Sequence, residues 1–179
     1  EAFYSQGATP VNSLIAGEGI KSLASALRRM SSGNDDVVAR GDGLYGAWLC
    51  GTALGSAGVA LHHKFAHVLG STFGLEHSKA HTVALPHSVA YTAPGVPEAM
   101  HQISKALGDE NKDAATALYE LNVSIGAPTS LKELGMPFEG IDQAAKMISD
   151  SPYPNPVPID YKPIKEMIIK AWNGGPPFT

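Results

Sequence analysis

Five of the seven histidines lie close together in the sequence, and their spacing is the feature of this chain best suited to chemistry. His63 and His67 are four residues apart, and so are His77 and His81. Residues four apart lie on one face of a helix, so two short helices joined at residues 70–74 would aim both pairs at one pocket. Imidazole is the commonest metal ligand and the usual acid or base near neutral pH. The sequence therefore predicts the functional site in this segment.

Lys64 stands between two of these histidines, so one helical turn carries an ammonium group beside imidazoles. Such a turn suits a small anionic substrate such as a carboxylate, and a solvated lysine is the alternative. His62 is either a further site residue or a core histidine. His87 and His101 stand outside the paired spacings, and we expect ordinary surface or core roles for them.

Metal and nucleophilic chemistry are the next alternatives for this segment. A catalytic metal site usually takes three protein ligands and one open position. The histidines supply nitrogen ligands, but the nearest acids, Asp42 and Glu76, stand at no ligand spacing. The absence of H-E-x-x-H argues against a metalloprotease. Cys50 lies in an apolar run and is interpreted as a small buried hydrophobe, and no G-x-S-x-G turn occurs, so nucleophilic catalysis is not supported.

Helical periodicity runs through nearly the whole chain, and strand-like alternation is almost absent. We therefore predict one all-α domain over residues 1–179, a bundle of about seven to nine helices. Pro86 falls within the second histidine helix, where we expect a kink or break. Pro97 and Gly108 mark the start and the C-cap of a later helix. The pattern Ser130–Glu133 predicts a capping box that opens a short helix.

Gly41, Gly43 and Gly46 match the pattern G-x-G-x-x-G. The dinucleotide-binding fingerprint requires a strand before the glycines and an acidic residue about 20 positions after them. The preceding segment is too short and polar for that strand, and the histidines lie where the acid should be. We interpret the pattern as a glycine-rich helix start that packs closely.

The composition limits the classes of function. The net charge is −4, and no stripe of Lys and Arg is visible, which argues against nucleic acid. Charged residues make up 17%, below the usual ~25%, so we expect part of the surface to face another domain or subunit, with a homodimer as the oligomer. One cysteine fits a reducing compartment, and no signal peptide or run of 18 apolar residues appears. We expect a cytoplasmic protein that does not span a membrane.

The histidine segment also resembles a known family. The run HHKFAHVLG at residues 62–70, followed by His77 and by Leu-Pro at 85–86, resembles the signature of the iron-containing alcohol dehydrogenases. The fuller string HHKFAHVLGSTFGLEHSKAHTVALPH is closer to the maleylacetate reductase branch of that family. The tail is similar to the same branch at residues 127–136, 155–159 and 171–172.

The resemblance implies a place within a larger enzyme. Members of this family have an N-terminal α/β domain that binds NAD(P)H and a C-terminal all-α domain, the latter related to that of dehydroquinate synthase-like enzymes. The chain resembles the C-terminal domain alone. Glu1 would follow directly after the family's first ligand pair, D-x-x-x-H or its branch variant. We therefore expect a longer polypeptide, or a companion chain, that supplies the nucleotide-binding domain.

The resemblance also assigns roles to residues. His63 and His77 match two metal-ligand positions, with Fe²⁺ or Zn²⁺ as the implied ion, and His63 alternatively polarises the substrate directly. His67 matches the position beside the nicotinamide and the substrate, which implies a catalytic proton relay. In the maleylacetate reductase branch the aspartate ligand is often replaced, so a metal-bound and a metal-free site both stay open.

The implied reaction is reduction of a small unsaturated oxo-dicarboxylate by NAD(P)H, with Lys64, His62 and His81 as substrate contacts. Two alternatives remain. In the first, the chain is a truncated relative that no longer catalyses a redox reaction and uses the histidine pocket, sealed by dimerisation, for an isomerase, lyase or cyclase reaction. In the second, the chain is a non-catalytic binding module, which an exposed apolar face would indicate.

Overall fold

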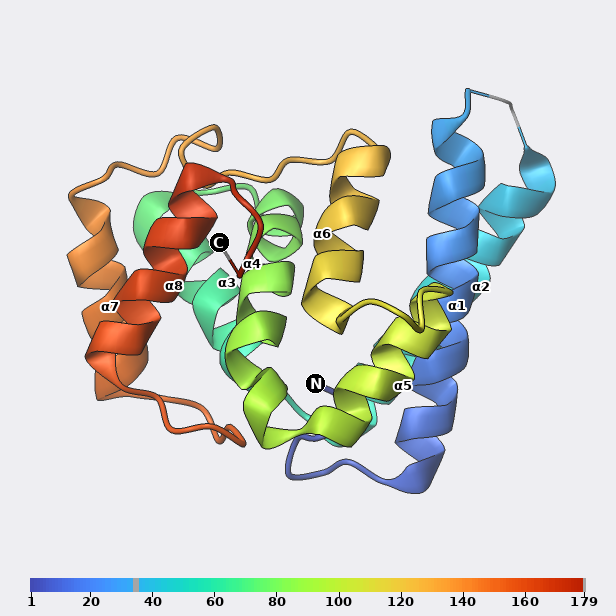
Figure 1. The fold of residues 1–179 in the computed structure, drawn as a ribbon, viewed down its shortest axis with the longest axis horizontal. Coiled ribbons are helices and arrows are strands. Elements are labelled where there is room, and N and C mark those ends of the chain that lie inside the picture. The colour runs from blue at the N-terminus through green and yellow to red at the C-terminus, as the bar shows by residue number, and fades with distance from the viewer. Residues whose placement is uncertain (34–35, 179) are drawn as a thin grey trace.

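The computed structural model describes residues 1–33 and 36–178, and this part of the chain is helical without a strand, as predicted (Figure 1). The predicted break at residues 31–35 falls partly outside the described residues. The helices are α1 Pro10–Ser31, α2 Val37–Ala57, α3 Leu61–Phe73, α4 His77–Thr92, the 3₁₀ helix η1 Ala93–Gly95, α5 Pro97–Leu107, α6 Ala114–Ser124, α7 Gly140–Asp150 and α8 Tyr161–Asn173.

Helices α1 and α2 lie side by side as a hairpin at one end of the molecule (Figure 1). They approach closely because glycine faces glycine at the crossing. A Cβ atom added at Gly46 would lie 2.8 Å from the backbone nitrogen of Leu23 and 2.9 Å from the carbonyl oxygen of Gly19. The close packing predicted for the glycine pattern is confirmed, but the predicted helix start is wrong, since α2 already begins at Val37.

Helix α4 is the centre of the fold because it packs into two separate hydrophobic clusters. Val83 and Ala84 belong to the cluster formed with α3, α7 and α8, and Val89 belongs to the cluster formed with α1, α5 and α6. Figure 1 shows α4 between these two groups of helices. The backbone positions of the histidines on α3 and α4 are therefore fixed by packing on both sides of α4.

The sequence suggested a kink or break at Pro86, and the structure shows no break, because α4 continues through this residue. Proline has no N–H group, so the carbonyl group one turn earlier, that of Thr82, loses its helical partner. The side chain of Asn122 on α6 donates a hydrogen bond to this carbonyl oxygen at 3.0 Å. A neighbouring helix thus replaces the missing bond, and α4 continues to Thr92.

Two other local predictions had different outcomes. Helix α5 begins at Pro97 and ends at Gly108, a left-handed C-cap with φ +79°, as predicted. The short helix predicted after Ser130 is wrong, because this segment forms turns instead. The Ser130 hydroxyl donates to the carbonyl of Trp172 at 2.7 Å, so the segment is tied to the end of α8 rather than to a helix of its own.

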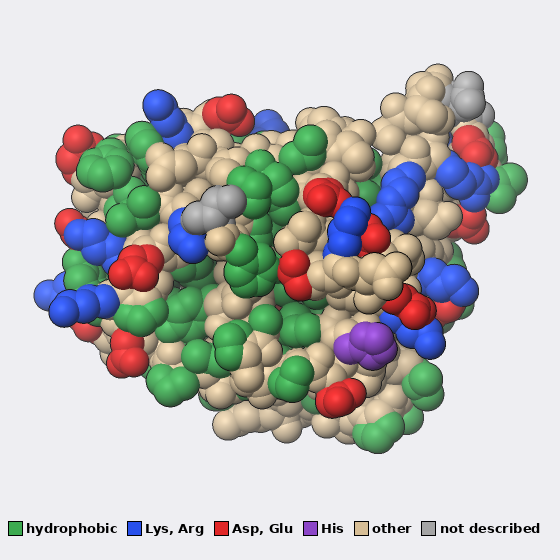
Figure 2. Space-filling view, viewed as in Figure 1, with side chains coloured by type: hydrophobic (Ala, Val, Ile, Leu, Met, Phe, Trp, Pro, Cys, Tyr) green, Lys and Arg blue, Asp and Glu red, His purple; other side chains and the backbone are tan. Residues whose placement is uncertain are grey.

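The surface is unusually apolar along α2. Leu44 and Trp48 are exposed by 74% and 65%, and no charged residue occurs in this helix after Asp42. Figure 2 shows another part of the surface, away from α2, where hydrophobic side chains gather in the middle of the view between charged side chains at both ends. Among the described residues no single helix is long and apolar enough to cross a membrane; α2 and α3 satisfy the length and composition only as a pair bent by 101°.

Candidate functional site

The structure brings the five clustered histidines together, as their spacing predicted. The ring centroid of His81 lies 4.4 Å from that of His77, 4.8 Å from that of His62 and 5.0 Å from that of His63. The ring of His67 lies 5.9 Å from His63 and 6.4 Å from His77. Helices α3 and α4 thus present their rings to a common centre. We call this group of five rings the histidine cluster.

The five histidines of the cluster differ in solvent exposure. His62 is buried, His63 and His81 are half-buried, and His67 and His77 are exposed. Burial, followed by the positive charge of neighbouring histidines, lowers the pKa of His67 below its usual value. His67 is therefore mainly neutral near pH 7, and it can accept or pass on a proton.

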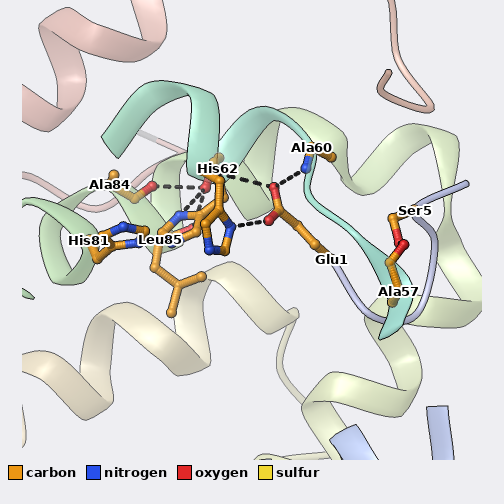
Figure 3. A network of polar contacts seen from close by, with 10 residues as sticks. Glu1, Ser5, Ala57, Ala60, His62, His81, Ala84 and Leu85 are labelled. Carbon is orange, nitrogen blue, oxygen red and sulfur yellow. Dashed lines mark hydrogen bonds and ion pairs between the residues drawn. The ribbon is translucent and has the colours of Figure 1, made fainter. Parts of the chain in front are cut away.

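His62 has both ring nitrogens engaged within the chain. Its Nδ1 lies 3.2 Å from Oγ of Ser88, and its Nε2 lies 2.8 Å from Nδ1 of His81 (Figure 3). Burial lowers the pKa of His62 to about 3. Burial and the neighbouring histidines lower that of His81 to about 4. His62 thus lies behind His81, and a direct contact between His62 and substrate stays a prediction.

Glu1 is a site residue that the sequence did not reveal. Its carboxylate contacts Nδ1 of His63 and accepts a hydrogen bond from the backbone N–H of Ala60 at 2.9 Å (Figure 3). The hydroxyl of Ser5 holds this segment by donating to the carbonyl of Ala57 at 2.7 Å. Burial alone would raise the pKa of Glu1, but the hydrogen bond with His63 and nearby positive charge outweigh it and hold the pKa at about 2. No local pattern links residue 1 to residue 63, so only the fold shows this pair.

Lys64 and Tyr153 form the open edge of the cluster. The Nζ atom of Lys64 lies 5.3 Å from the ring centroid of Tyr153, and that ring lies 6.4 Å from the ring of His67. The sequence predicted an irregular segment over residues 151–163, and the structure is irregular over residues 151–160. No pattern in the sequence predicted that Tyr153 lies beside the histidines. One ammonium, one phenol and one imidazole therefore lie next to one another at the exposed side of the cluster.

Three residues set apart by the sequence stay outside the cluster. His87 is buried beside α8, and burial lowers its pKa to about 4. His101 is exposed on α5. Cys50 borders a mainly apolar cavity of about 270 Å³ that reaches from α1 and α2 to Glu1, His62 and His63, and burial raises the pKa of the thiol. A raised thiol pKa disfavours the nucleophilic thiolate. Cys50 is half-buried, however, and not the fully buried hydrophobe that the sequence suggested.

Comparison with known proteins places this geometry in a family. The model of the C-terminal domain of the Fe-containing alcohol dehydrogenase family matches residues 1–172. The chain belongs to the iron-containing alcohol dehydrogenase family. Maleylacetate reductase from Sphingobium indicum is 49% identical over 179 residues, which are 100% of this chain and 50% of that protein. Maleylacetate reductase from Burkholderia cepacia is 44% identical over 174 residues, 97% of this chain and 49% of that protein.

Solved structures of this oxidoreductase family share the helical fold. The crystal structure of maleylacetate reductase from Agrobacterium tumefaciens superimposes with a TM-score of 0.93 at 36% identity, covering 99% of this chain and 50% of that one. An alcohol dehydrogenase structure from Ralstonia eutropha gives 0.96 at 46% identity, with the same two coverages. The chain therefore spans about half the length of the relatives it matches.

The family name implies iron, but the described side chains of this half of the fold do not fit a metal site by themselves. Among the described residues, no group of three His, Cys, Asp or Glu side chains is arranged to hold a metal ion. Nδ1 of His63 is already bound by Glu1. This half of the family's fold does not make a three-ligand site by itself, so we derive no step through a metal. The assignment of His63 and His77 as ligands stays a prediction.

Proposed function

We propose that this chain is the substrate-side half of an NAD(P)H-dependent reductase that acts on a small unsaturated oxo-dicarboxylate, with maleylacetate as the substrate. The observation that carries the proposal is the joint opening of Lys64, His67 and Tyr153 onto the histidine cluster. The curated relatives that cover the whole chain are maleylacetate reductases, which supports the choice of substrate.

The proposed reaction adds two hydrogens across the carbon–carbon double bond conjugated to the ketone. The nicotinamide supplies the hydride, and its own ring is oxidised. The hydride forms a new C–H bond at the alkene carbon remote from the ketone, and the alkene electron pair moves to make an enolate. A proton then adds to the carbon next to the ketone, and 3-oxoadipate results.

In this proposal the residues of this chain bind the doubly charged dicarboxylate substrate and transfer the proton. The Lys64 ammonium lies at the open edge, where it can pair with a substrate carboxylate. His67 is the neighbouring exposed imidazole, and its lowered pKa suits a group that passes a proton near neutral pH. Behind it, the hydrogen bond between buried His62 and His81 holds these two rings in place.

The proposal includes a second half of the enzyme, either in one polypeptide or as a companion chain, and a homodimer in the cytoplasm as the assembled form. The chain matches only about half the length of each relative, which leaves room for a nucleotide-binding domain. The apolar exposed side of α2, with Leu44 and Trp48, supports the idea that another protein surface covers this helix.

The test is an assay of nicotinamide oxidation with maleylacetate and the complete protein, using NADH and NADPH in turn. We expect turnover with the complete protein, none with residues 1–179 alone, and severe loss in His67→Ala. His101→Ala is the matched control because His101 is an exposed histidine outside the cluster. Maleylacetate turnover without a nicotinamide would instead support the isomerase, lyase or cyclase alternative. A complete protein that binds the dicarboxylate without any turnover would favour a binding module.

A further inference from the structure

Three side chains form a line of hydrogen bonds behind the histidine cluster: Ser88, His62 and His81. The Ser88 hydroxyl lies 2.9 Å from the carbonyl oxygen of Ala84 and 3.0 Å from that of Leu85, on its own helix (Figure 3). A serine hydroxyl has a single hydrogen, and these carbonyls accept it. The Ser88 oxygen therefore presents only a lone pair to Nδ1 of His62.

This lone pair decides which nitrogen of His62 carries a hydrogen. Nδ1 must donate, because the Ser88 oxygen can only accept. The ring of His62 is buried, and its two nitrogens face a hydroxyl and another imidazole with no carboxylate between them, so the ring holds one N–H group. Nε2 of His62 is therefore an acceptor, and Nδ1 of His81, 2.8 Å away, is the donor.

We propose that Ser88 and His62 are positioning residues that hold His81 in its Nδ1–H tautomer, so that Nε2 of His81 is a hydrogen-bond acceptor for the bound ligand. This Nε2 atom is buried and has no hydrogen-bond partner among the described residues. Buried polar atoms in folded proteins rarely lack a partner, and a missing partner within a site is best explained by a ligand. The nearest ring centroid, 4.4 Å away, belongs to His77, which is exposed, so rotation of that side chain gives the ligand access.

The tautomer selects the chemistry of the ligand. An Nε2 lone pair repels carboxylate and ketone oxygens, which offer only lone pairs, and it bonds with a hydroxyl group. In the proposed reaction, on which this ligand assignment rests, the hydroxyl belongs to the enol tautomer of the oxo-dicarboxylate, which forms when a proton moves from the CH2 group between the ketone and the carboxylate to the ketone oxygen, and which returns to the keto form before the hydride is transferred. His81 therefore contacts the oxo end of the substrate in its enol form, in place of the carboxylate contact expected from the sequence.

The tautomers can be observed directly by long-range ¹H–¹⁵N spectra of the complete protein labelled with ¹⁵N-histidine, recorded near pH 7 with a chelator present. We expect the Nδ1–H form for both His62 and His81. In Ser88→Ala, His62 has no acceptor at Nδ1, and both rings should change to the Nε2–H form. Ser104→Ala removes a buried helical serine away from the cluster and should change neither ring. An Nε2–H form of His81 in the unmodified protein, or no change in Ser88→Ala, would overturn the relay.

The ligand assignment is tested with two dicarboxylates of matched length, adipate and 3-hydroxyadipate, by titration calorimetry on the complete protein. We expect 3-hydroxyadipate to bind about ten-fold more tightly, the gain of about one hydrogen bond. Ser88→Ala should abolish this preference and leave the Kd of adipate unchanged. Equal affinities in the unmodified protein, or a preference that survives in Ser88→Ala, would refute the acceptor role of His81. If neither compound binds, the proposed substrate class fails, and the spectra still decide the relay.

Discussion

Alanine at Gly46 should destabilise this chain, whereas alanine at Gly51, on the same helix, should stabilise it. The Cβ atom at Gly46 would lie 2.8 Å from the backbone nitrogen of Leu23 and 2.9 Å from the carbonyl oxygen of Gly19. Backbone atoms cannot rotate away, so α1 and α2 must separate, at a cost near the upper end of overpacking, about 3 kcal/mol. Alanine gains about 1 kcal/mol over glycine within a helix, which leaves about 2 kcal/mol of net destabilisation.

Gly51 is the matched control because no atom lies within 4 Å of its added Cβ. Gly51→Ala should therefore show the helix gain alone, about 1 kcal/mol. Thermal unfolding of the isolated chain followed by circular dichroism measures both variants. For a domain of this size we expect Tm to fall by about 4–8 °C in Gly46→Ala and to rise by about 2–4 °C in Gly51→Ala. Equal stability of the two variants would refute the close crossing of α1 and α2.

The remaining predictions concern the site and its support. Lys64→Met should raise KM for a dicarboxylate by about 10–100-fold with a smaller effect on kcat, and an unchanged KM would remove Lys64 from the site. His67→Ala should lower kcat by about 100-fold or more without a change in circular dichroism, and near-normal turnover would contradict the proton role. Asn122→Ala leaves the Thr82 carbonyl unpaired and should lower the unfolding free energy by about 1 kcal/mol, measured by urea titration. The pKa of Glu1 in the folded chain, about 2, lies below its ordinary value of 4.5, so the stabilisation by its carboxylate should be complete above about pH 5 and decline as the pH falls toward 2. A Glu1→Gln chain should lose this part of the acid dependence, measured as the midpoint of urea unfolding at each pH.

The histidine cluster could be predicted from the sequence because it depends on the spacing of residues that are close together in the chain. Residues four apart share a helix face whatever surrounds the helix, so the pairs at His63 and His67 and at His77 and His81 converge once two helices form. The start and end of α5 followed in the same way from Pro97 and its C-cap glycine. Each of these features depends on residues within about one or two turns.

The features that the sequence did not reveal depend on distant partners. Helix α4 continues through Pro86 because Asn122 on α6 supplies the missing bond. The segment after Ser130 forms turns because its polar groups bond to the end of α8. Glu1 reaches the histidine cluster across more than 60 residues. In each case a tertiary hydrogen bond overrides or completes a local preference, and no spacing rule detects it. Ser88 is different, since it follows His81 by seven residues on one helix and lies on the same face.

The shared position of α4 has a consequence for the cooperativity of unfolding. The two hydrophobic clusters each take residues from this one helix, Val83 and Ala84 on one side and Val89 on the other. Loss of either cluster removes half of the support of α4 and exposes apolar surface of the other, so neither half of the bundle is an independent folding unit. The helix that carries His81 should then hold the most slowly exchanging amide hydrogens of the chain. The site therefore persists as long as the domain is folded and is lost with it in a single transition.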